Sequence, residues 1–244
     1  MYRVGTDRQQ GLPEEFTIFA HRGASGYEPE NTLRSFRRAM AMGTRWLELD
    51  VYAVAGALVV IHDATLERTT NGRGYVMDQT LAYLRSLDAG KGEKIPLLEE
   101  VLAMLGPGDG LNIELKGPAT AAPLAALLAA SPQGARTDPE QLLVSSFNYE
   151  ELIALRRLRP DLRIAPLVTA VPRCYARFAE EMGAYAVHGT LKAATEKFIA
   201  DAHRRGLKFH AFTANTRKDM DIMLARGADG VFTDYPDLRP GLCP

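Results

Sequence analysis

The sequence predicts an α/β fold in which eight parallel strands close into a (β/α)8 barrel. Short β-rich runs alternate with helical stretches through most of the 244 residues, which favours a parallel sheet with crossover helices. Eight strands and roughly 250 residues are also the number and size typical of a closed barrel. Several expected helices end at a glycine before the next strand, as at Met42-Gly43 and Met182-Gly183, and glycine after the last turn is a common helix stop.

The elements follow in order along the chain. The expected barrel strands are short apolar runs, at Phe16–Ala20, Arg45–Val51, Leu111–Leu115, Leu142–Ser146, Arg163–Val168, Ala184–Val187, Lys208–Phe212 and Gly230–Thr233. The expected helices lie between them, at Thr32–Met42, Glu99–Leu105, Ala119–Ala130, Tyr149–Arg157, Tyr175–Met182, Ala194–Arg204 and Arg217–Ala225.

One segment interrupts this alternation. Apolar character returns at Leu58–Ile61, only a few residues after Val51 and with Gly56 between. A parallel crossover needs about a dozen residues or more, so this pair is expected to form an antiparallel hairpin. The hairpin would return His62 to the level of Glu48 and Asp50.

Residues 63–110 show turn signals, such as Asn71-Gly72 and Ala89-Gly90, and no clear strand. We interpret them as a small insertion on the strand-end face, with one or two helices around Leu81–Leu87 and Glu99–Leu105. The sequence shows no convincing repeat or low-complexity linker. We therefore expect one domain over residues 1–244.

Composition argues for a soluble globular chain. Apolar residues make up 46% and charged residues 24% of the sequence, which are ordinary values. A net charge of −1 gives no support for a nucleic-acid partner. Cys174 and Cys243 are too few for a disulfide framework and indicate a reducing compartment. Residues 1–15 lack the apolar core of a signal peptide, and Ala119–Ala130 is too short to span a bilayer. A cytoplasmic protein is expected.

Three carboxylates are the first candidate site residues. Glu48, Asp50 and Glu114 alternate with leucine or isoleucine. In a strand, the polar residues of each segment therefore share one face. Acids buried in this way are costly without a partner or a metal, and their hard oxygen atoms suit Mg²⁺ or Ca²⁺. A barrel-end salt bridge with arginine is the alternative.

Two histidines, His21 and His62, each end an apolar run near these acids. The pair suits a general acid and a general base near neutral pH, although a metal site that includes histidine stays open. Arg22 and Lys116 flank the proposed residues and would hold a phosphate beside a metal. They would also balance the three acids.

The other histidines and one asparagine have weaker claims. His203 is expected to be solvated on a helix, and His210 to point into or behind the barrel wall. His188 is expected to end a strand and could line the pocket. For Asn31, capping of the following helix is favoured over a substrate or metal role.

These residues resemble the glycerophosphodiester phosphodiesterases, of the small bacterial cytosolic kind. The matching motifs run in order from Phe19 to Pro236. They are His21-Arg22-Gly23, Pro29-Glu30-Asn31-Thr32, Glu48-Leu49-Asp50-Val51, Val60-Ile61-His62-Asp63, Thr65-Leu66-Glu67-Arg68-Thr69-Thr70, Ile95-Pro96-Leu97-Leu98-Glu99-Glu100, Glu114-Leu115-Lys116, Ser145-Ser146-Phe147, Phe212-Thr213-Ala214-Asn215 and Thr233-Asp234-Tyr235-Pro236.

The resemblance implies a distorted TIM (β/α)8 barrel with a short insertion, and hydrolysis of a glycerophosphodiester to sn-glycerol 3-phosphate and an alcohol. It implies a divalent cofactor, Mg²⁺ or Ca²⁺, and a small-molecule substrate without stable membrane association. A homodimer is possible on composition alone. The implied roles are catalytic for His21 and His62, metal-binding for Glu48, Asp50 and Glu114, and phosphate-binding for Arg22 and Lys116.

The chain departs from the family pattern at two places. Phe212 stands where the family usually has tryptophan, which could alter how the glycerol or the alcohol group packs. The hairpin turn Val54-Ala55-Gly56-Ala57 lacks the usual Lys-Asp-Gly. Neither change touches the proposed chemistry, and Phe212 is kept as a substrate-binding candidate.

Two other functions are weighed. A related barrel phosphodiesterase could act on intact phospholipids, but the sequence shows no obvious exposed apolar or basic rim between Asp63 and Gly110. A non-catalytic barrel that binds glycerophosphodiesters would be expected to have lost a histidine or a metal carboxylate, and none is missing. The sequence leaves open the preferred alcohol, the working metal, which histidine is the acid, and whether a cyclic phosphate forms.

Overall fold

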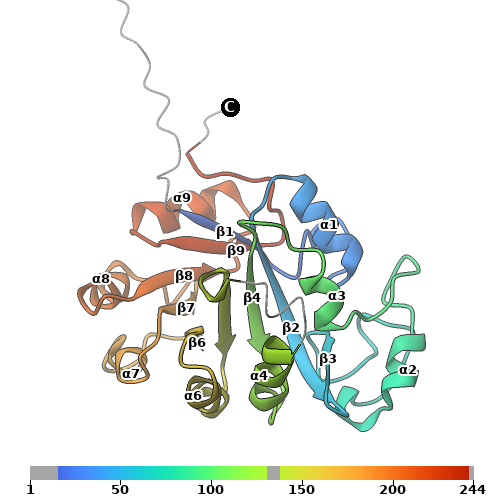
Figure 1. Cartoon of the computed structure of the whole chain (residues 1–244). Helices are drawn as coiled ribbons and strands as arrows, with labels where there is room; N and C mark the ends of the chain where they lie inside the picture. The colour runs from blue at the N-terminus through green and yellow to red at the C-terminus, as the bar shows by residue number, and fades with distance from the viewer. Residues whose placement is uncertain (1–15, 131–137, 242–244) are drawn as a thin grey trace, which may run out of the picture.

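The computed structural model describes residues 16–130 and 138–241. In this part of the chain eight parallel strands close into a barrel, because β1 pairs with both β2 and β9 (Figure 1). The predicted barrel is confirmed. Residues 1–15, which were expected to lack a signal peptide, lie outside the described residues, and so does Cys243. The barrel strands are β1 (Thr17–Ala20), β2 (Trp46–Val54), β4 (Gly110–Leu115), β5 (Leu142–Ser146), β6 (Arg163–Val168), β7 (Ala186–Thr190), β8 (Lys208–Phe212) and β9 (Gly230–Thr233).

The pairing of β2 with β4 sets up the later chemistry. Their register places Glu48 opposite Asn112 and Asp50 opposite Glu114. Directly paired residues of parallel strands point to the same face. Glu48 therefore lies beside the Asn112 amide, and Asp50 lies beside Glu114, on one face of the two strands.

The predicted hairpin is confirmed. Strand β3 (Ala57–Val60) runs antiparallel to the far half of β2, with Val51 opposite Val60. Ala55 and Gly56 form its two-residue turn with φ of 49° and 84°. Two consecutive positive φ values are what a type I′ hairpin turn requires, and glycine meets that requirement without steric cost.

Helices cover the outside of the barrel (Figure 1). Their bounds are α1 (Leu33–Ala41), α4 (Ala121–Ala130), α6 (Tyr149–Leu158), α7 (Arg177–Glu181), α8 (Glu196–Arg204) and α9 (Arg217–Ala225). The predicted capping of the first helix by Asn31 is wrong. The Thr32 side chain accepts the Ser35 N–H and caps α1, which leaves the Asn31 amide available elsewhere.

Strand β7 (Ala186–Thr190) both begins and ends later than the predicted strand Ala184–Val187. His188 therefore lies in the middle of the strand and not at its end. The Ala184 N–H donates to the Ala179 carbonyl at the end of α7, which delays the start of the strand. At the other end, Gly189 and Thr190 pair with β8 and extend it.

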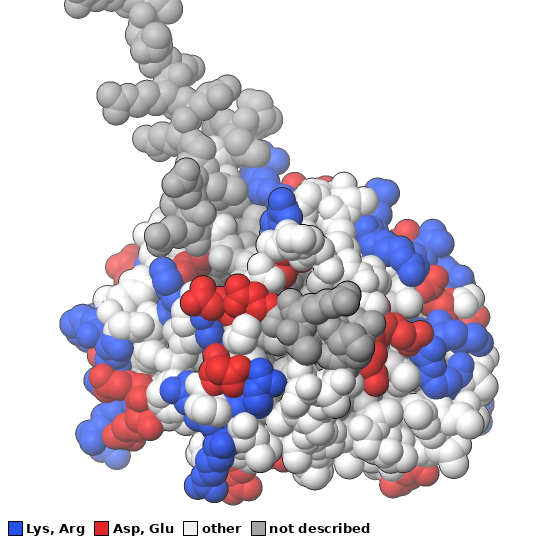
Figure 2. Space-filling view, in the orientation of Figure 1, with Lys and Arg blue, Asp and Glu red and all other residues white. Residues whose placement is uncertain are grey.

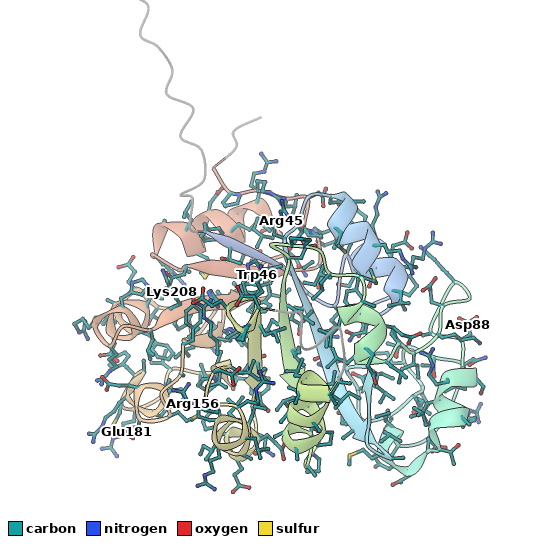
Figure 3. The ribbon with its side chains drawn as sticks, in the orientation of Figure 1. Arg45, Trp46, Asp88, Arg156, Glu181 and Lys208 are labelled. Carbon is teal, nitrogen blue, oxygen red and sulfur yellow. The ribbon has the colours of Figure 1, made fainter. Side chains whose placement is uncertain are left out.

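Residues 63–110 form a lobe beside β2 and β3, at the right of Figures 1 and 3, where Asp88 is labelled. It contains η1 (Val76–Asp78), α2 (Leu81–Ser86) and α3 (Leu98–Leu102). We propose that the lobe belongs to the barrel domain. The α3 side chains Leu98, Val101 and Leu102 pack in the main core of the barrel, and the other buried apolar side chains of the lobe share one cluster with the hairpin. That cluster comprises Tyr52, Val54, Val59, Ile61, Leu66, Val76, Leu84, Leu87, Ala89 and Ile95.

The inside of the barrel is aromatic at its base. The Phe19 and Phe232 rings stack with centroids 4.5 Å apart, and Trp46, labelled in Figure 3, lies edge-on to Phe19 at 5.3 Å. His210 and His188 lie against these rings and are hydrogen-bonded to each other, Nδ1 to Nε2, at 3.2 Å. The prediction that His210 points into or behind the barrel wall is confirmed.

The outer surface shows charges of both signs, interspersed on the face in Figure 2. His203 is exposed on α8, as predicted, and is bonded to Asp229 at 2.8 Å. Among the described residues, no helix is long and apolar enough to cross a membrane.

The buried histidine pair predicts a loss of stability in acid. Burial lowers the pKa of His210 from 6.5 to about 4, with Asp229 raising it and Lys208 lowering it less. Between those values the unfolded chain binds a proton that the folded protein does not, so stability falls as pH falls through this window. For His210 we expect the free energy of unfolding to drop by about 2 kcal/mol from pH 7 to pH 5, measured by urea unfolding.

The His210→Gln variant should lose that part of the pH dependence, while His203→Gln, altered at the exposed surface, should keep it. An unchanged difference between pH 5 and pH 7 in His210→Gln would contradict the prediction.

Candidate active site

Three buried carboxylates form the centre of the site. Glu48, Asp50 and Glu114 are at most 8% exposed, and one oxygen from each lies within 4.8 Å of the others. All three come from the paired strands β2 and β4, whose register brings Asp50 beside Glu114. The three carboxylates lie together, as the sequence predicts. Only Glu114 is near the end of its strand, because β2 continues past Glu48 and Asp50 to Val54.

Their closeness has an electrostatic cost. Burial, and then the charge of Asp50, raise the pKa of Glu48 to about 8. The same two causes raise the pKa of Glu114. Asp50 Oδ1 is buried and has no hydrogen-bond partner among the described residues. Three hard oxygen donors that repel one another, one of them unsatisfied, fit a divalent cation.

Two cations partly balance the acids. Lys116 Nζ lies 2.7 Å from Glu114 Oε1 and 3.8 Å from Asp50 Oδ1. Arg22 Nε lies 3.3 Å from Asp50 Oδ2. Part of the salt-bridge alternative is therefore real, yet it leaves the raised pKa values of Glu48 and Glu114 in place.

The loop after β1 adds neutral donors to the same acids. The backbone N–H of Arg22 donates to Glu48 Oε2 at 2.8 Å. Asn31 Nδ2 donates to Asp50 Oδ2 at 2.8 Å, so this side chain positions a proposed metal ligand. Arg22 and Asn31 both have φ of 56°, a left-handed conformation that is uncommon for residues other than glycine.

His21 is oriented by an aspartate from the far end of the chain. Its Nδ1 donates to Asp234 Oδ1 at 2.6 Å, and Asp234 also accepts from Ser25 Oγ at 2.9 Å and Asn215 Nδ2 at 2.5 Å. Burial alone would lower the pKa of His21. The Asp234 hydrogen bond and the Glu48 charge outweigh it and raise the pKa.

His62 is oriented in a similar way but lies in a different electrostatic environment. Its Nδ1 donates to Asp63 Oδ1 at 2.6 Å, and its Nε2 accepts from Lys116 Nζ at 3.1 Å. Burial lowers the pKa of His62, and Arg22 and Lys116 lower it further against the opposing charge of Asp50. The pKa values of the two histidines are thus shifted in opposite directions, although each is paired with an aspartate.

An ion-pair chain ties the lobe to the site. Arg68 donates to Asp63 at 2.5 Å and 2.9 Å and to both Glu30 oxygens at 2.7 Å and 2.8 Å. Glu30 in turn accepts from Arg22 Nη1 at 2.8 Å. Arg68 holds the pKa of Asp63 well below its usual range, so Asp63 stays ionised beside His62.

The site opens into a cavity of about 120 Å³ inside the barrel. Phe212 forms part of its wall and meets Phe147 edge-on at 6.2 Å, with Lys116 Nζ 5.9 Å from the Phe147 ring. Seven of the eight predicted site residues line this cavity, and Asp50 lies directly behind it. The structure brings them together; the roles assigned to them stay predictions.

Sequence reasoning missed the residues that orient the histidines. Asp63 and Asp234 stand in motifs that the sequence singled out, but neither received a role. The position of Asp234 directly after the last strand was the available signal, since closure of a barrel places the last strand beside the first.

The lobe carries three exposed apolar or aromatic side chains, in a segment whose sequence shows no obvious apolar or basic rim. Tyr75, Met77 and Tyr83 are 62%, 44% and 38% exposed. Met77 also lies close to Gly117, the residue that follows Lys116. The lobe is short, so its core cannot enclose every apolar side chain that it carries.

Comparisons with known proteins agree with this geometry. The model of the glycerophosphoryl diester phosphodiesterase family matches residues 21–238. The chain is 38% identical to a glycerophosphodiester phosphodiesterase of Bacillus subtilis (strain 168), over 93% of this chain and 86% of that protein. It is 36% identical to one from Caldanaerobacter subterraneus subsp. tengcongensis, over 90% and 94%. An Oleispira antarctica phosphodiesterase solved in complex with the product sn-glycerol-3-phosphate is similar with a TM-score of 0.80 and 33% identity, over 91% of this chain and 94% of that one.

The acid cluster predicts opposite effects of one substitution with and without a cation. Glu48→Gln keeps an acceptor for the Arg22 N–H but removes a carboxyl whose pKa is raised to about 8. A raised carboxyl pKa costs the folded state stability as pH rises from 4.5 towards 8. At pH 8 in EDTA we expect the variant to be more stable than the parent by roughly 1–3 kcal/mol.

With Mg²⁺ or Ca²⁺ the parent should gain melting temperature, and Glu48→Gln should gain little. Thermal unfolding with and without each ion measures both effects. Glu140→Gln, at a carboxyl that is 77% exposed, should behave as the parent does. A less stable Glu48→Gln in EDTA, or an undiminished response to the ions, would remove the cation site from this cluster.

Proposed function

We infer the mechanism from the premise that this chain belongs to the glycerophosphoryl diester phosphodiesterase family and is a glycerophosphodiester phosphodiesterase. We propose that it releases sn-glycerol 3-phosphate and an alcohol, with a divalent cation, Mg²⁺ or Ca²⁺, and two histidines as acid and base. One observation carries this proposal: two aspartate-oriented histidines flank a buried triad of carboxylates in one cavity.

The substrate's phosphate is proposed to bind between Arg22, Lys116 and the acid triad. When bound by Glu48, Asp50 and Glu114, a divalent cation would neutralise phosphate oxygens and stabilise the charge that develops on them. The two cationic side chains lie within reach of the same place, since both contact Asp50. They would hold the diester and stabilise charge in the transition state.

His62 is proposed as the general base. Its Nδ1 proton is held by Asp63, and its Nε2 accepts from an ammonium group, so the ring is neutral and its lone pair faces the site. It would take the proton of the attacking hydroxyl, which belongs to water or to the glycerol 2-hydroxyl, as the new P–O bond forms.

His21 is proposed as the general acid. The Asp234 carboxylate and the nearby Glu48 favour its charged form. It would give its proton to the oxygen of the departing alcohol as the old P–O bond breaks. With water as the nucleophile, one proton is taken and one given, and sn-glycerol 3-phosphate forms directly. With the glycerol 2-hydroxyl, the first product is a cyclic phosphate. Water then opens its ring, with His21 taking the proton of water and His62 returning one to the 2-oxygen.

Two alternatives are tested with it. The exposed Met77, which lies close to Gly117, favours a second candidate, hydrolysis of intact phospholipids at a surface. A non-catalytic binding barrel is disfavoured because no catalytic candidate is missing. We propose a small glycerophosphodiester as the substrate, a cytoplasmic setting and a possible homodimer. The substrate is supported by the product complex of the Oleispira relative, the setting by the sparse cysteines, and the dimer only by composition.

The reaction class is tested with glycerophosphocholine. Purified protein should release sn-glycerol 3-phosphate, EDTA should abolish the activity, and Mg²⁺ or Ca²⁺ should restore it. The same assay on phosphatidylcholine vesicles separates the lipid candidate. Release of phosphorylated product from vesicles alone would favour that candidate, and activity that survives EDTA would refute the metal dependence.

The acid–base pair is tested by His21→Ala and His62→Ala. Each should lower kcat by a factor of about 10²–10⁴, the usual contribution of general acid–base catalysis, with an unchanged far-ultraviolet circular dichroism spectrum. His203→Ala, on the exposed surface, is the matched control and should retain full turnover. A near-parental kcat for either catalytic variant would exclude that histidine from the mechanism.

A further inference from the structure

The floor of the cavity carries two polar atoms without partners. Asn112 and His188 are at most 1% exposed. Asn112 Oδ1 and His188 Nδ1 have no hydrogen-bond partner among the described residues. An unsatisfied buried polar atom costs about 1–3 kcal/mol. Two of them at one end of a cavity point to something polar that binds there.

The other polar atoms of these side chains are fixed in place. Asn112 Nδ2 donates to Ser145 Oγ at 2.9 Å, which holds the amide plane. His188 Nε2 is hydrogen-bonded to His210 Nδ1 at 3.2 Å. Both anchors are inside the barrel, so the free Asn112 oxygen and the free His188 nitrogen are held in position before any ligand arrives.

This floor is continuous with the proposed catalytic site. Asn112, Ser145 and His188 line the same cavity as His21, Glu48 and Glu114. Asn112 precedes Glu114 by two residues on β4 and therefore points to the same face, one level deeper in the barrel. Phe232 closes the cavity beside them.

We propose that Asn112 and His188 bind the terminal hydroxyl of the substrate's glycerol group, with the phosphate above them at the acid triad. The inference deepens the proposed function and depends on it. It orients the substrate: glycerol points into the barrel, and the departing alcohol faces the opening.

The chemistry of the floor selects a hydroxyl. A hydroxyl has one proton, so it donates to the Asn112 oxygen and accepts from the His188 Nδ1–H. This requires the His188 tautomer whose Nε2 accepts from His210 Nδ1–H. A trimethylammonium group, as in choline, has no proton to donate and would leave the Asn112 oxygen unsatisfied. Burial lowers the pKa of His188 well below its usual value, so the floor is neutral and offers no charge to attract a headgroup.

The opening of the cavity has the opposite character. Phe147 is 46% exposed, and it meets Phe212 edge-on at the wall. Aromatic side chains accept apolar or cationic groups of many shapes and impose little hydrogen-bond selection. The alcohol side of the substrate is therefore expected to vary freely, whereas the glycerol side is read by fixed partners.

The test compares two substrates that differ only in the terminal hydroxyl. One is glycerophosphocholine, and the other is the phosphocholine diester of 1,2-propanediol, which keeps the 2-hydroxyl. The parent protein should prefer the first in kcat/KM by about tenfold or more, the effect of about 1.4 kcal/mol. Asn112→Leu and His188→Phe should lose most of this preference through a raised KM for glycerophosphocholine, with little change for the analogue.

Leu167→Met is the matched control, because it alters an apolar residue of the same cavity wall and should leave the preference unchanged. His188→Gln restores a hydrogen-bonding group and should recover part of it. Calorimetry gives a readout without turnover: Asn112→Leu should weaken binding of sn-glycerol 3-phosphate but not of inorganic phosphate.

The outcomes separate the two proposals. A parent protein inactive on every glycerophosphodiester would refute the proposed function. An active parent that does not distinguish the two diesters would refute only the hydroxyl site, as would folded Asn112→Leu and His188→Phe variants that keep the full preference. If Asn112→Leu does not fold, His188→Phe and His188→Gln decide the matter on the same two measurements.

Discussion

The mutual repulsion of three buried carboxylates is the constraint around which the site is organised. Glu48, Asp50 and Glu114 are forced together by the register of two adjacent strands, and no low-energy arrangement leaves all three ionised and unpaired. The neighbouring groups offset this repulsion with positive charge or with hydrogen-bond donors. Arg22 does so with both its guanidinium and its backbone N–H, and Lys116 with its ammonium group. A divalent cation bound by the three acids would complete the same balance.

The pKa values of the two histidines are shifted in opposite directions. Each has an aspartate at Nδ1, so pairing alone would make them equivalent. Asp63, however, is shared with Arg68, while Asp234 is shared only with the neutral donors Ser25 and Asn215. Arg68 of the lobe holds the pKa of Asp63 well below its usual range. The pKa of His62 itself is lowered by burial, Arg22 and Lys116.

Much of the fold could be predicted from local patterns. The alternation of short apolar runs with helical stretches, and the glycines that end helices, are both features of short stretches of sequence. The hairpin at Gly56 was predictable for the same reason, since its brevity excluded a crossover. Asn31 was misjudged because capping is a local preference, whereas its bond to Asp50 depends on a strand that follows 19 residues later. The partner of His21 and the unpaired atoms of Asn112 and His188 depend on closure of the barrel and could not be seen before it. Exposure of Tyr75 and Met77 depends on how little core the lobe has, which composition does not reveal.

Barrel closure also has a consequence for how the protein is made. The hydrogen bond that orients His21 joins residues 213 positions apart in sequence, from the first and last strands of the barrel. While the ribosome is still synthesising the chain, the acid triad and His62 can already be present, but Asp234 cannot. His21 therefore lacks its orienting partner until residue 234 has emerged. Until then, a nascent chain would carry the proposed metal ligands without an oriented His21.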